Sequence, residues 1–319
     1  MFENVKWRIA SGVSKRHVIR SAIDHNKLGN FIVGKLDSVY DSFSGMIWNS
    51  GRVTQGPQLP MSVIREIIRD YKDQGVTFSL VCSNNLLKQS HLHDDYCNKI
   101  LLILDEYNGN IIISSDIMFH HVKKNFKRLK TIHSCIPNKS DLVYLKEKQD
   151  QYDMVVLPPK SNLDFDLISQ LDTNKLELLV NEYCLRDCAV REKHYISLSQ
   201  ASLDGDYTND YKEKNCPRRT TPYIECVEKS CLLDYKEVLD LHIELGINNF
   251  KLQGRAAPDE FFIFDFVKYL CRPDMNSFIF RELFSMTQHA RMQMQMQNQV
   301  NVEGIAQKDR ILNQGGFRK

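Results

Sequence analysis

The chain lacks any long apolar segment, since none of its apolar runs approaches the roughly 18–20 residues needed to span a bilayer. Its first residues, Met-Phe-Glu-Asn-Val-Lys-Trp-Arg, have neither the apolar stretch nor the small-residue cleavage site of a signal peptide. A strong excess of charge is also missing, because 42 lysines and arginines balance 40 aspartates and glutamates. We therefore expect a cytoplasmic protein with no membrane partner, and the composition gives no strong signal for nucleic acid.

Familiar catalytic motifs are missing as well. The sequence has no G-x-S-x-G nucleophile elbow, no phosphate-cradling glycine motif and no H-E-x-x-H zinc-protease motif. His242 and Glu244 imitate the H-x-E of zinc deaminases, but no P-C-x-x-C follows and both fall within an amphipathic helix pattern. These hydrolase, nucleotide-binding and deaminase chemistries therefore have no motif to support them.

What the sequence does have is a regular alternation of strand-like and helix-like stretches. Val63, Ile64, Ile67, Ile68 and Tyr71, for example, recur at helical spacing. This pattern predicts an amphipathic helix over residues 61–74, ended by Gly75. About eight strands, most of them followed by a helix, are typical of a (β/α)8 TIM-like barrel. A doubly wound open sheet is the alternative, but the Gly-rich first turn typical of that fold is missing. The predicted strands are residues 5–10, 36–42, 76–82, 110–115, 129–135, 152–157, 176–184 and 249–255.

The predicted barrel domain spans residues 1–272 and contains a cysteine-bearing insertion at about 185–231, between the seventh and eighth strands. Residues 273–319 change character, because Met292 to Asn298 is rich in methionine and glutamine and a Gly-Gly pair lies near the end. We predict a polar C-terminal helix and a flexible tail there, which is more typical of a solvated helix or a partner arm than of a catalytic element.

Nine cysteines are present, and in the cytosol they are expected to be reduced thiols. Cys184 and Cys188 follow the predicted seventh strand, and Cys216, Cys226 and Cys231 come later in the insertion. Thiolates from neighbouring loops bind zinc or an iron–sulfur cluster when they converge on one point. One C-x3-C pair followed by isolated cysteines favours a cluster over structural zinc, and unligated thiols are the third interpretation. Arginines that could donate hydrogen bonds to the cluster are Arg186, Arg191, Arg218 and Arg219.

Barrel active sites lie on the loops at the carboxyl ends of the strands. The predicted strand ends therefore make site candidates of Cys184, Arg255, Asn84, Asn85 and Arg52. Asp41 and Glu182 are candidate acids or bases, and a cysteine paired with His194 is a candidate nucleophile.

Several stretches, in order over roughly residues 5–270, share the pattern of one family. Asp37-Ser-Val-Tyr40 is followed by Gly51-Arg52, and the third predicted strand runs into Ser83-Asn-Asn-Leu-Leu. Asn181-Glu-Tyr-Cys-Leu-Arg-Asp-Cys188 precedes Arg191 and His194, and the last predicted strand ends in Lys251-Leu-Gln-Gly-Arg255, where the family usually has Lys-Ile-Glu-Gly-Arg. The chain thus resembles the collagenase-like peptidases of unassigned mechanism (family U thirty-two), which include oxygen-independent hydroxylases.

The resemblance implies a barrel whose four cysteines hold a 4Fe–4S cluster. It also implies hydroxylation of quinone precursors, transfer RNA or ribosomal RNA without molecular oxygen, in some members with prephenate as the oxygen donor. Carried over by position, Lys251 and Arg255 would face an anionic substrate or co-substrate. Asn84, Arg52 and Glu182 complete the expected catalytic set. The implied ligands are Cys184, Cys188, Cys216 and Cys231, with Cys226 as the alternative fourth, and the implied cofactor-binding residues are Arg191 and His194.

Gln253 departs from the family pattern by removing a charge, and the interval from Cys216 to Cys231 is shorter than in the better-known hydroxylases. Both departures concern the substrate more than the cluster. The leading hypothesis is an iron–sulfur enzyme that hydroxylates, or otherwise modifies by redox chemistry, a small molecule, RNA base or peptide, with zinc as the alternative metal. The other hypotheses are a collagenase-like peptidase and a non-catalytic heterodimer partner of a paralogue.

Overall fold

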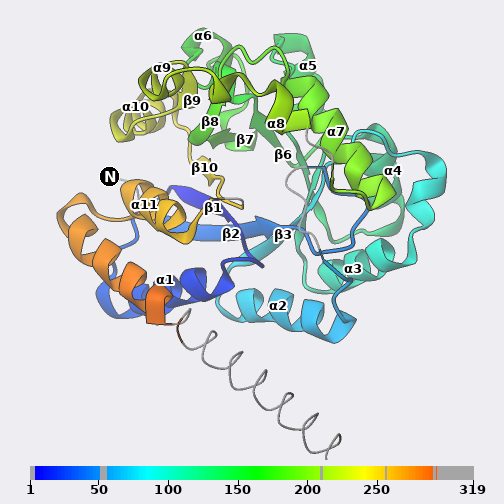
Figure 1. Cartoon of the computed structure of the whole chain (residues 1–319), viewed down its shortest axis with the longest axis horizontal. Coiled ribbons are helices and arrows are strands. Elements are labelled where there is room, and N and C mark those ends of the chain that lie inside the picture. Colours follow the sequence, from blue (N-terminus) through cyan, green and yellow to red (C-terminus); the bar gives the residue numbers. More distant parts are fainter. Residues whose placement is uncertain (1–3, 51–55, 209–210, 256, 290–291, 293–319) are drawn as a thin grey trace, which may run out of the picture.

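The computed structural model of the chain describes residues 4–50, 56–208, 211–255, 257–289 and 292. Its barrel strands are Lys6–Ala10 (β1), Lys35–Asp41 (β2), Thr77–Cys82 (β3), Asn110–Ile113 (β4), Lys130–His133 (β5), Met154–Leu157 (β6), Leu176–Leu179 (β7) and Asn249–Leu252 (β10). They pair in parallel and close in the order β1-β10-β7-β6-β5-β4-β3-β2 (Figure 1). The predicted TIM-like (β/α)8 barrel is confirmed.

Helices cover the outside of the barrel (Figure 1). They are Arg16–Gly29 (α1), Met61–Asp73 (α2), Asp95–Glu106 (α3), Asp116–Asn125 (α4), Leu142–Gln151 (α5), Phe165–Ile168 (α6), Tyr235–Leu245 (α10) and Asp259–Leu270 (α11). On α2, Ile64, Ile67, Ile68 and Tyr71 are buried and face the core, whereas Val63, the fifth residue of the predicted apolar stripe, is exposed. At the start of α10, Asp234 and Glu237 bond each other's backbone amides in a capping box, which fixes where that helix begins.

Two apolar layers form the core. The larger layer lies between the strands and the surrounding helices and includes the fully buried Trp7 and Trp48. A smaller layer fills the inside of the barrel and consists of Ala10, Tyr40, Val81, Ile112, Ile132 and Val156. This inner layer matters for the site, because several of its members form the floor of the cavity described below.

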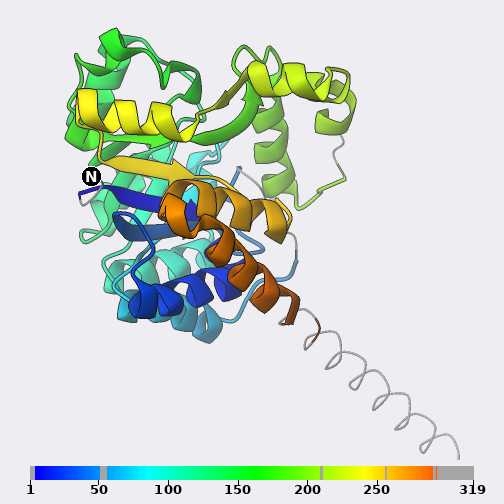
Figure 2. The ribbon, with the colours of Figure 1, turned by 90° about the vertical axis from the view of Figure 1, so that its left-hand side faces the viewer.

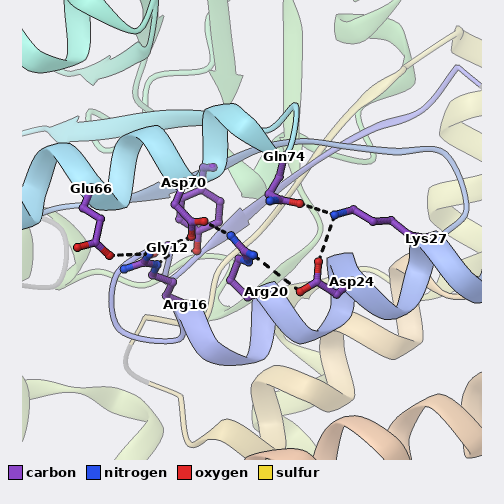
Figure 3. A network of polar contacts seen from close by, with 9 residues as sticks. Gly12, Arg16, Arg20, Asp24, Lys27, Glu66, Asp70 and Gln74 are labelled. Atoms are coloured by element: carbon purple, nitrogen blue, oxygen red, sulfur yellow. Dashed lines mark hydrogen bonds and ion pairs between the residues drawn. The ribbon is translucent and has the colours of Figure 1, made fainter.

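A network of charged side chains joins α1 to α2 on the outside of the barrel (Figure 3). Arg16 Nη2 lies 3.0 Å from Asp70 Oδ2, and Arg20 pairs with the same carboxylate. Beside this network the Tyr71 hydroxyl donates to the backbone oxygen of Gly12 at 2.8 Å. The network therefore holds the loop between β1 and α1 in place, and that loop leads to the mouth of the barrel.

The predicted seventh strand, residues 176–184, is wrong in its second half. The barrel strand β7 ends at Leu179, and Asn181–Leu185 (β8) instead pairs antiparallel with Ser230–Leu232 (β9) in a separate ribbon. The side chain of Asn181 explains the break. It accepts from the backbone amide of Gln253 at 2.7 Å and donates to the backbone oxygen of Gln253 at 3.0 Å. These two side-chain bonds take the place of the backbone hydrogen bonds that a continuing strand would make next to β10, so the main chain can turn away. For the same reason β10 ends at Leu252 and does not reach residue 255.

The cysteine-bearing insertion is the segment from β8 to β9. Between these strands it contains Arg191–Asp204 (α7), Tyr211–Asn215 (α8) and Tyr223–Glu228 (α9). Figure 2 shows this segment beyond the carboxyl ends of the barrel strands, on one side of the mouth. The insertion therefore supplies one wall of the region in which a barrel enzyme carries its active site.

After α11 the chain forms a further helix over residues 276–289, which confirms the predicted C-terminal helix. This helix is not polar all round, because Ile279 and Leu283 are buried against the barrel domain. The predicted flexible tail, including nearly all of the methionine- and glutamine-rich stretch, lies outside the described residues. Within the described ranges, no helix combines the length and apolar character required to cross a bilayer.

Candidate active site at the barrel mouth

A cavity of about 80 Å³ opens at the carboxyl ends of the barrel strands. Its floor comes from the inner apolar layer and its walls come from the loop after β10, from β8 and from α7. The polar or ionisable side chains that line it include Tyr40, Cys135, Glu182, Tyr195, Lys251, Gln253 and Arg255. Lys251, Arg255 and Glu182, three of the predicted catalytic residues, therefore line one cavity.

Lys251 is held by a buried carboxylate below the cavity. Its ammonium lies 2.8 Å from Glu177 Oε1 and 4.2 Å from the centre of the Tyr40 ring. Glu177 Oε2 also accepts from Arg8 Nη1 at 2.9 Å. Burial raises the pKa of Glu177, but the cations of Lys251 and Arg8 outweigh it, so the pKa ends below its usual value. The positive charge of Lys251 is therefore largely neutralised within the barrel.

Arg255 is placed differently. Its Nη1 lies 3.9 Å from Asp41 Oδ1 and 3.4 Å from Ser42 Oγ, and both distances are long for a guanidinium. Asp41 is already bonded by backbone amides, including those of Val13 at 3.0 Å and Ser42 at 2.9 Å. Burial raises the pKa of Asp41, although the Arg255 cation and these amides oppose the shift. Among the described residues, Arg255 thus has only long polar contacts, and it has donors left for a ligand.

Glu182 is fixed by donors from three directions. Its Oε1 accepts from the backbone amide of Cys184 at 3.0 Å and from Gln253 Nε2 at 3.1 Å, and its Oε2 lies 3.4 Å from Arg191 Nη2. Gln253 Nε2 also donates to the backbone oxygen of Asn181 at 2.9 Å. The carboxylate therefore has a defined orientation at the wall of the cavity.

The residues around Arg191 extend this wall. The guanidinium is buried and lies 5.4 Å from the centre of the Tyr195 ring, and its Nε has no hydrogen-bond partner among the residues that the structure describes. Burial raises the pKa of Tyr195 to about 12, so its hydroxyl stays protonated at neutral pH. Burial also raises the pKa of the Cys135 thiol, although Arg191 and Lys251 lower it in part. This thiol is therefore not set up as a thiolate nucleophile.

Two other predicted residues, Asn84 and His194, do not line the cavity. Asn84 is completely buried, and its amide donates to the backbone oxygens of Ile47 and Ser199 at 3.0 Å each. The structure thus gives Asn84 a positioning role, because it ties α7 to the loop after β3. His194 lies on α7 with its ring stacked 5.8 Å from that of Tyr195. Arg52 lies outside the described residues.

The cysteines test whether an iron–sulfur cluster or zinc fits this fold. Across the described ranges, which include all the predicted ligands, no group of three histidine, cysteine, aspartate or glutamate residues could hold a metal ion. Cys226 donates its thiol to the backbone oxygen of Thr221 at 3.5 Å, and burial raises the pKa of Cys231 to about 11. Cys184 lies on β8, away from the end of a barrel strand where it was predicted. As folded here, the cysteines do not fit a cluster, and no step below involves one.

Cys135 and Tyr195 are among the cavity residues that were not predicted as site residues. Cys135 is the last residue of the predicted fifth strand, so the rule that barrel sites lie at strand ends would have found it. Tyr195 had no comparable signal, because α7 has a weak apolar stripe and follows no barrel strand directly.

Comparisons with known proteins agree with this fold. No family model matches the chain. Over 202 residues, 59% of its length, the chain is 26% identical to the uncharacterized protease MJ1657 of Methanocaldococcus jannaschii. That match spans 58% of the protease, somewhat over half of its length.

A solved structure, that of the U32 peptidase Mk0906, superposes with a TM-score of 0.53 over 80% of this chain and 94% of the other. At 13% identity this likeness concerns the fold alone. The chain is thus similar in sequence to an archaeal protein named as a protease and similar in fold to a U32 peptidase, in line with the resemblance drawn from its motifs.

Proposed function

We propose that the chain is a peptidase-type hydrolase that acts on polypeptides at the mouth of the barrel. The observation that carries this proposal is the presence, in one cavity, of the Glu182 carboxylate and of an Arg255 guanidinium with only long contacts to the described residues. The similarity to a protein named as a protease supports the same class of reaction.

The charges of the site suit a neutral amide with a polarised carbonyl. The ammonium of Lys251 lies 2.8 Å from the Glu177 carboxylate, which neutralises it. Lys251 therefore shapes the wall of the cavity more than it offers a positive charge to the substrate. Arg255 has donors for the carbonyl oxygen of a substrate, which becomes negative when water attacks the carbonyl carbon. The apolar floor, with Val81 and Ile112, keeps the local dielectric low and strengthens that interaction.

The proposal is tested with fluorescein-labelled casein and gelatin as substrates. The wild type is compared with Arg255→Met and with Arg272→Met, a matched control whose guanidinium is exposed and pairs with Asp274. We expect cleavage by the wild type and by the control, and a loss of about 100-fold in kcat for Arg255→Met, the usual effect of removing one such donor. A wild type that leaves both substrates intact contradicts the proposal, and so does an Arg255→Met variant as active as the control.

The second candidate function is the iron–sulfur hydroxylase implied by the family resemblance. It is favoured by the paired strands β8 and β9, which carry Cys184 and Cys231, and by the nearby Arg191. It requires a rearrangement of the insertion, because the described residues include no group of three histidine, cysteine, aspartate or glutamate side chains that could hold a metal ion. Iron content and the visible spectrum of protein purified without oxygen separate this candidate from the hydrolase.

A further inference from the structure

Within the proposed hydrolase, on which this inference rests, we propose that Glu182 is the general base that activates water and that Gln253 is the residue that positions it. Among the residues lining the cavity, Glu182 carries the carboxylate. Gln253 lines the same cavity, follows β10 directly and donates to Glu182 Oε1 at 3.1 Å.

The need for a glutamine at position 253 follows from its two acceptors. Its Nε2 donates to the backbone oxygen of Asn181 at 2.9 Å and to Glu182 Oε1 at 3.1 Å, so both of its amide hydrogens are used. An ionised glutamate has no hydrogen to donate, and at this position it would bring two carboxylates together. Gln253 therefore holds the Glu182 carboxylate in one orientation without placing a second carboxylate beside it.

The reaction uses water alone as co-reactant. Glu182 takes a proton from the water, the water oxygen bonds to the amide carbon, and the carbonyl electron pair moves onto the carbonyl oxygen. Arg255 donates to this oxygen and is unchanged at the end. When the carbonyl reforms, the C–N bond breaks and the proton held by Glu182 passes to the leaving nitrogen. Nothing is oxidised or reduced, and Gln253 acts only through Glu182.

The experiment compares initial rates of casein cleavage between pH 5 and pH 9 for the wild type, Glu182→Gln, Gln253→Glu and a matched control, Glu192→Gln, which is exposed on α7. We expect Glu182→Gln to lose about 100-fold or more, the usual contribution of a general base, and the control to match the wild type. Gln253→Glu should move the acid limb of the pH profile to higher pH, because two adjacent carboxylates share one proton. A purely structural role for Gln253 would lower the rate equally at every pH.

The failures of the two proposals are distinguishable. If the wild type cleaves casein and Glu182→Gln stays within about threefold of it, the general base is wrong while the hydrolase stands. A Cys135→Ser variant that loses all activity while Glu182→Gln keeps it would assign a thiol nucleophile and overturn the inference in the same way. If Glu182→Gln does not fold, as judged by circular dichroism, the pH profile of Gln253→Glu decides. If the wild type does not cleave casein, the proposed function itself fails.

Discussion

The side-chain amide of Gln253 bridges the backbone oxygen of Asn181, at 2.9 Å, and Glu182 Oε1, at 3.1 Å. This bridge joins the end of β10 to the start of β8, the two places where the chain leaves the barrel pattern. The glutamine that departs from the usual family motif is therefore the residue that the local hydrogen bonding requires.

Asn181→Ala should destabilise the protein. The Asn181 side chain bonds both the amide and the oxygen of the Gln253 backbone, and it donates to the buried Asp265 at 2.8 Å. Leaving such buried groups unsatisfied costs about 1–3 kcal/mol. Urea unfolding followed by circular dichroism measures this loss, and Asn215→Ala, an exposed residue on α8, serves as control. Equal stability of the two variants would contradict the role given to Asn181.

Glu177→Gln should be more damaging, because it leaves the buried cations of Arg8 and Lys251 without their common partner. Breaking a buried ion pair in this way costs about 3–5 kcal/mol. Since the folded-state pKa of Glu177 is lowered, its stabilisation is present above about pH 4.3 and is lost as the pH falls through the folded pKa.

The free energy of unfolding of the wild type and of Glu177→Gln, measured from pH 7 down to pH 3, tests this window. The difference between the two proteins should be constant from pH 7 to about pH 5 and should narrow below about pH 4.3. A difference that stays the same down to pH 3 would mean that Glu177 is not an ionised partner of these cations.

His133 should make the protein sensitive to mild acid. Its Nε2 lies 2.8 Å from the Tyr144 hydroxyl, and burial, helped by Lys148, lowers the pKa of His133 to about 4. The folded state therefore resists protonation that the unfolded state accepts near pH 6.5, so stability falls as the pH drops from about 6.5 toward 4. Between pH 7.5 and pH 5, this residue alone should cost about 2 kcal/mol. His133→Phe, compared by urea unfolding at both pH values, should lose less stability than the wild type, and an equal loss would refute the prediction.

Asn84→Ala should loosen α7 without unfolding the barrel. The Asn84 amide bonds the backbone oxygen of Ser199 in α7 and that of Ile47, while its own oxygen accepts from Leu86. Hydrogen exchange should therefore increase over residues 191–204 more than in the barrel strands. Uniform exchange across the chain would show that the contact with Asn84 does not hold this helix.

Much of the fold could be predicted from local patterns, but the elements that shape the site could not. The α2 stripe and the glycine after it give a helix of nearly the predicted length, because its burial follows directly from its period. The sequence of α5 shows no clear helical stripe, because its Lys-Glu-Lys-Gln-Asp-Gln end obscures the apolar face. The sequence of α7 lacks a clear stripe as well, so neither helix could be predicted from periodicity. The break at Asn181 depends on contacts with Gln253, 72 residues away, which no local pattern contains.

For the site, three of the residues that line the cavity could be predicted from the sequence, but whether each of their charges is neutralised by a neighbour could not. Lys251, Arg255 and Glu182 lie in the carboxyl-terminal halves of predicted strands, and the carboxyl ends of barrel strands meet at one mouth, where these residues line one cavity. Whether a cation is neutralised, as Lys251 is by Glu177, depends on register across the barrel. Of the cysteines in the insertion, Cys184 and Cys231 lie on the β8–β9 ribbon, Cys226 lies on α9, and Cys188 and Cys216 lie in loops. Spacing along the chain therefore said little about their separation in space.

The most direct test of the proposed hydrolase is casein cleavage by the wild type and by Glu182→Gln, with iron and zinc assayed in the same oxygen-free samples. We expect the wild type to cleave casein after treatment with a chelator and the Glu182→Gln variant to be slower by about 100-fold or more. A brown protein with about four irons per chain and no cleavage of casein would contradict it, and would make the iron–sulfur hydroxylase the working model.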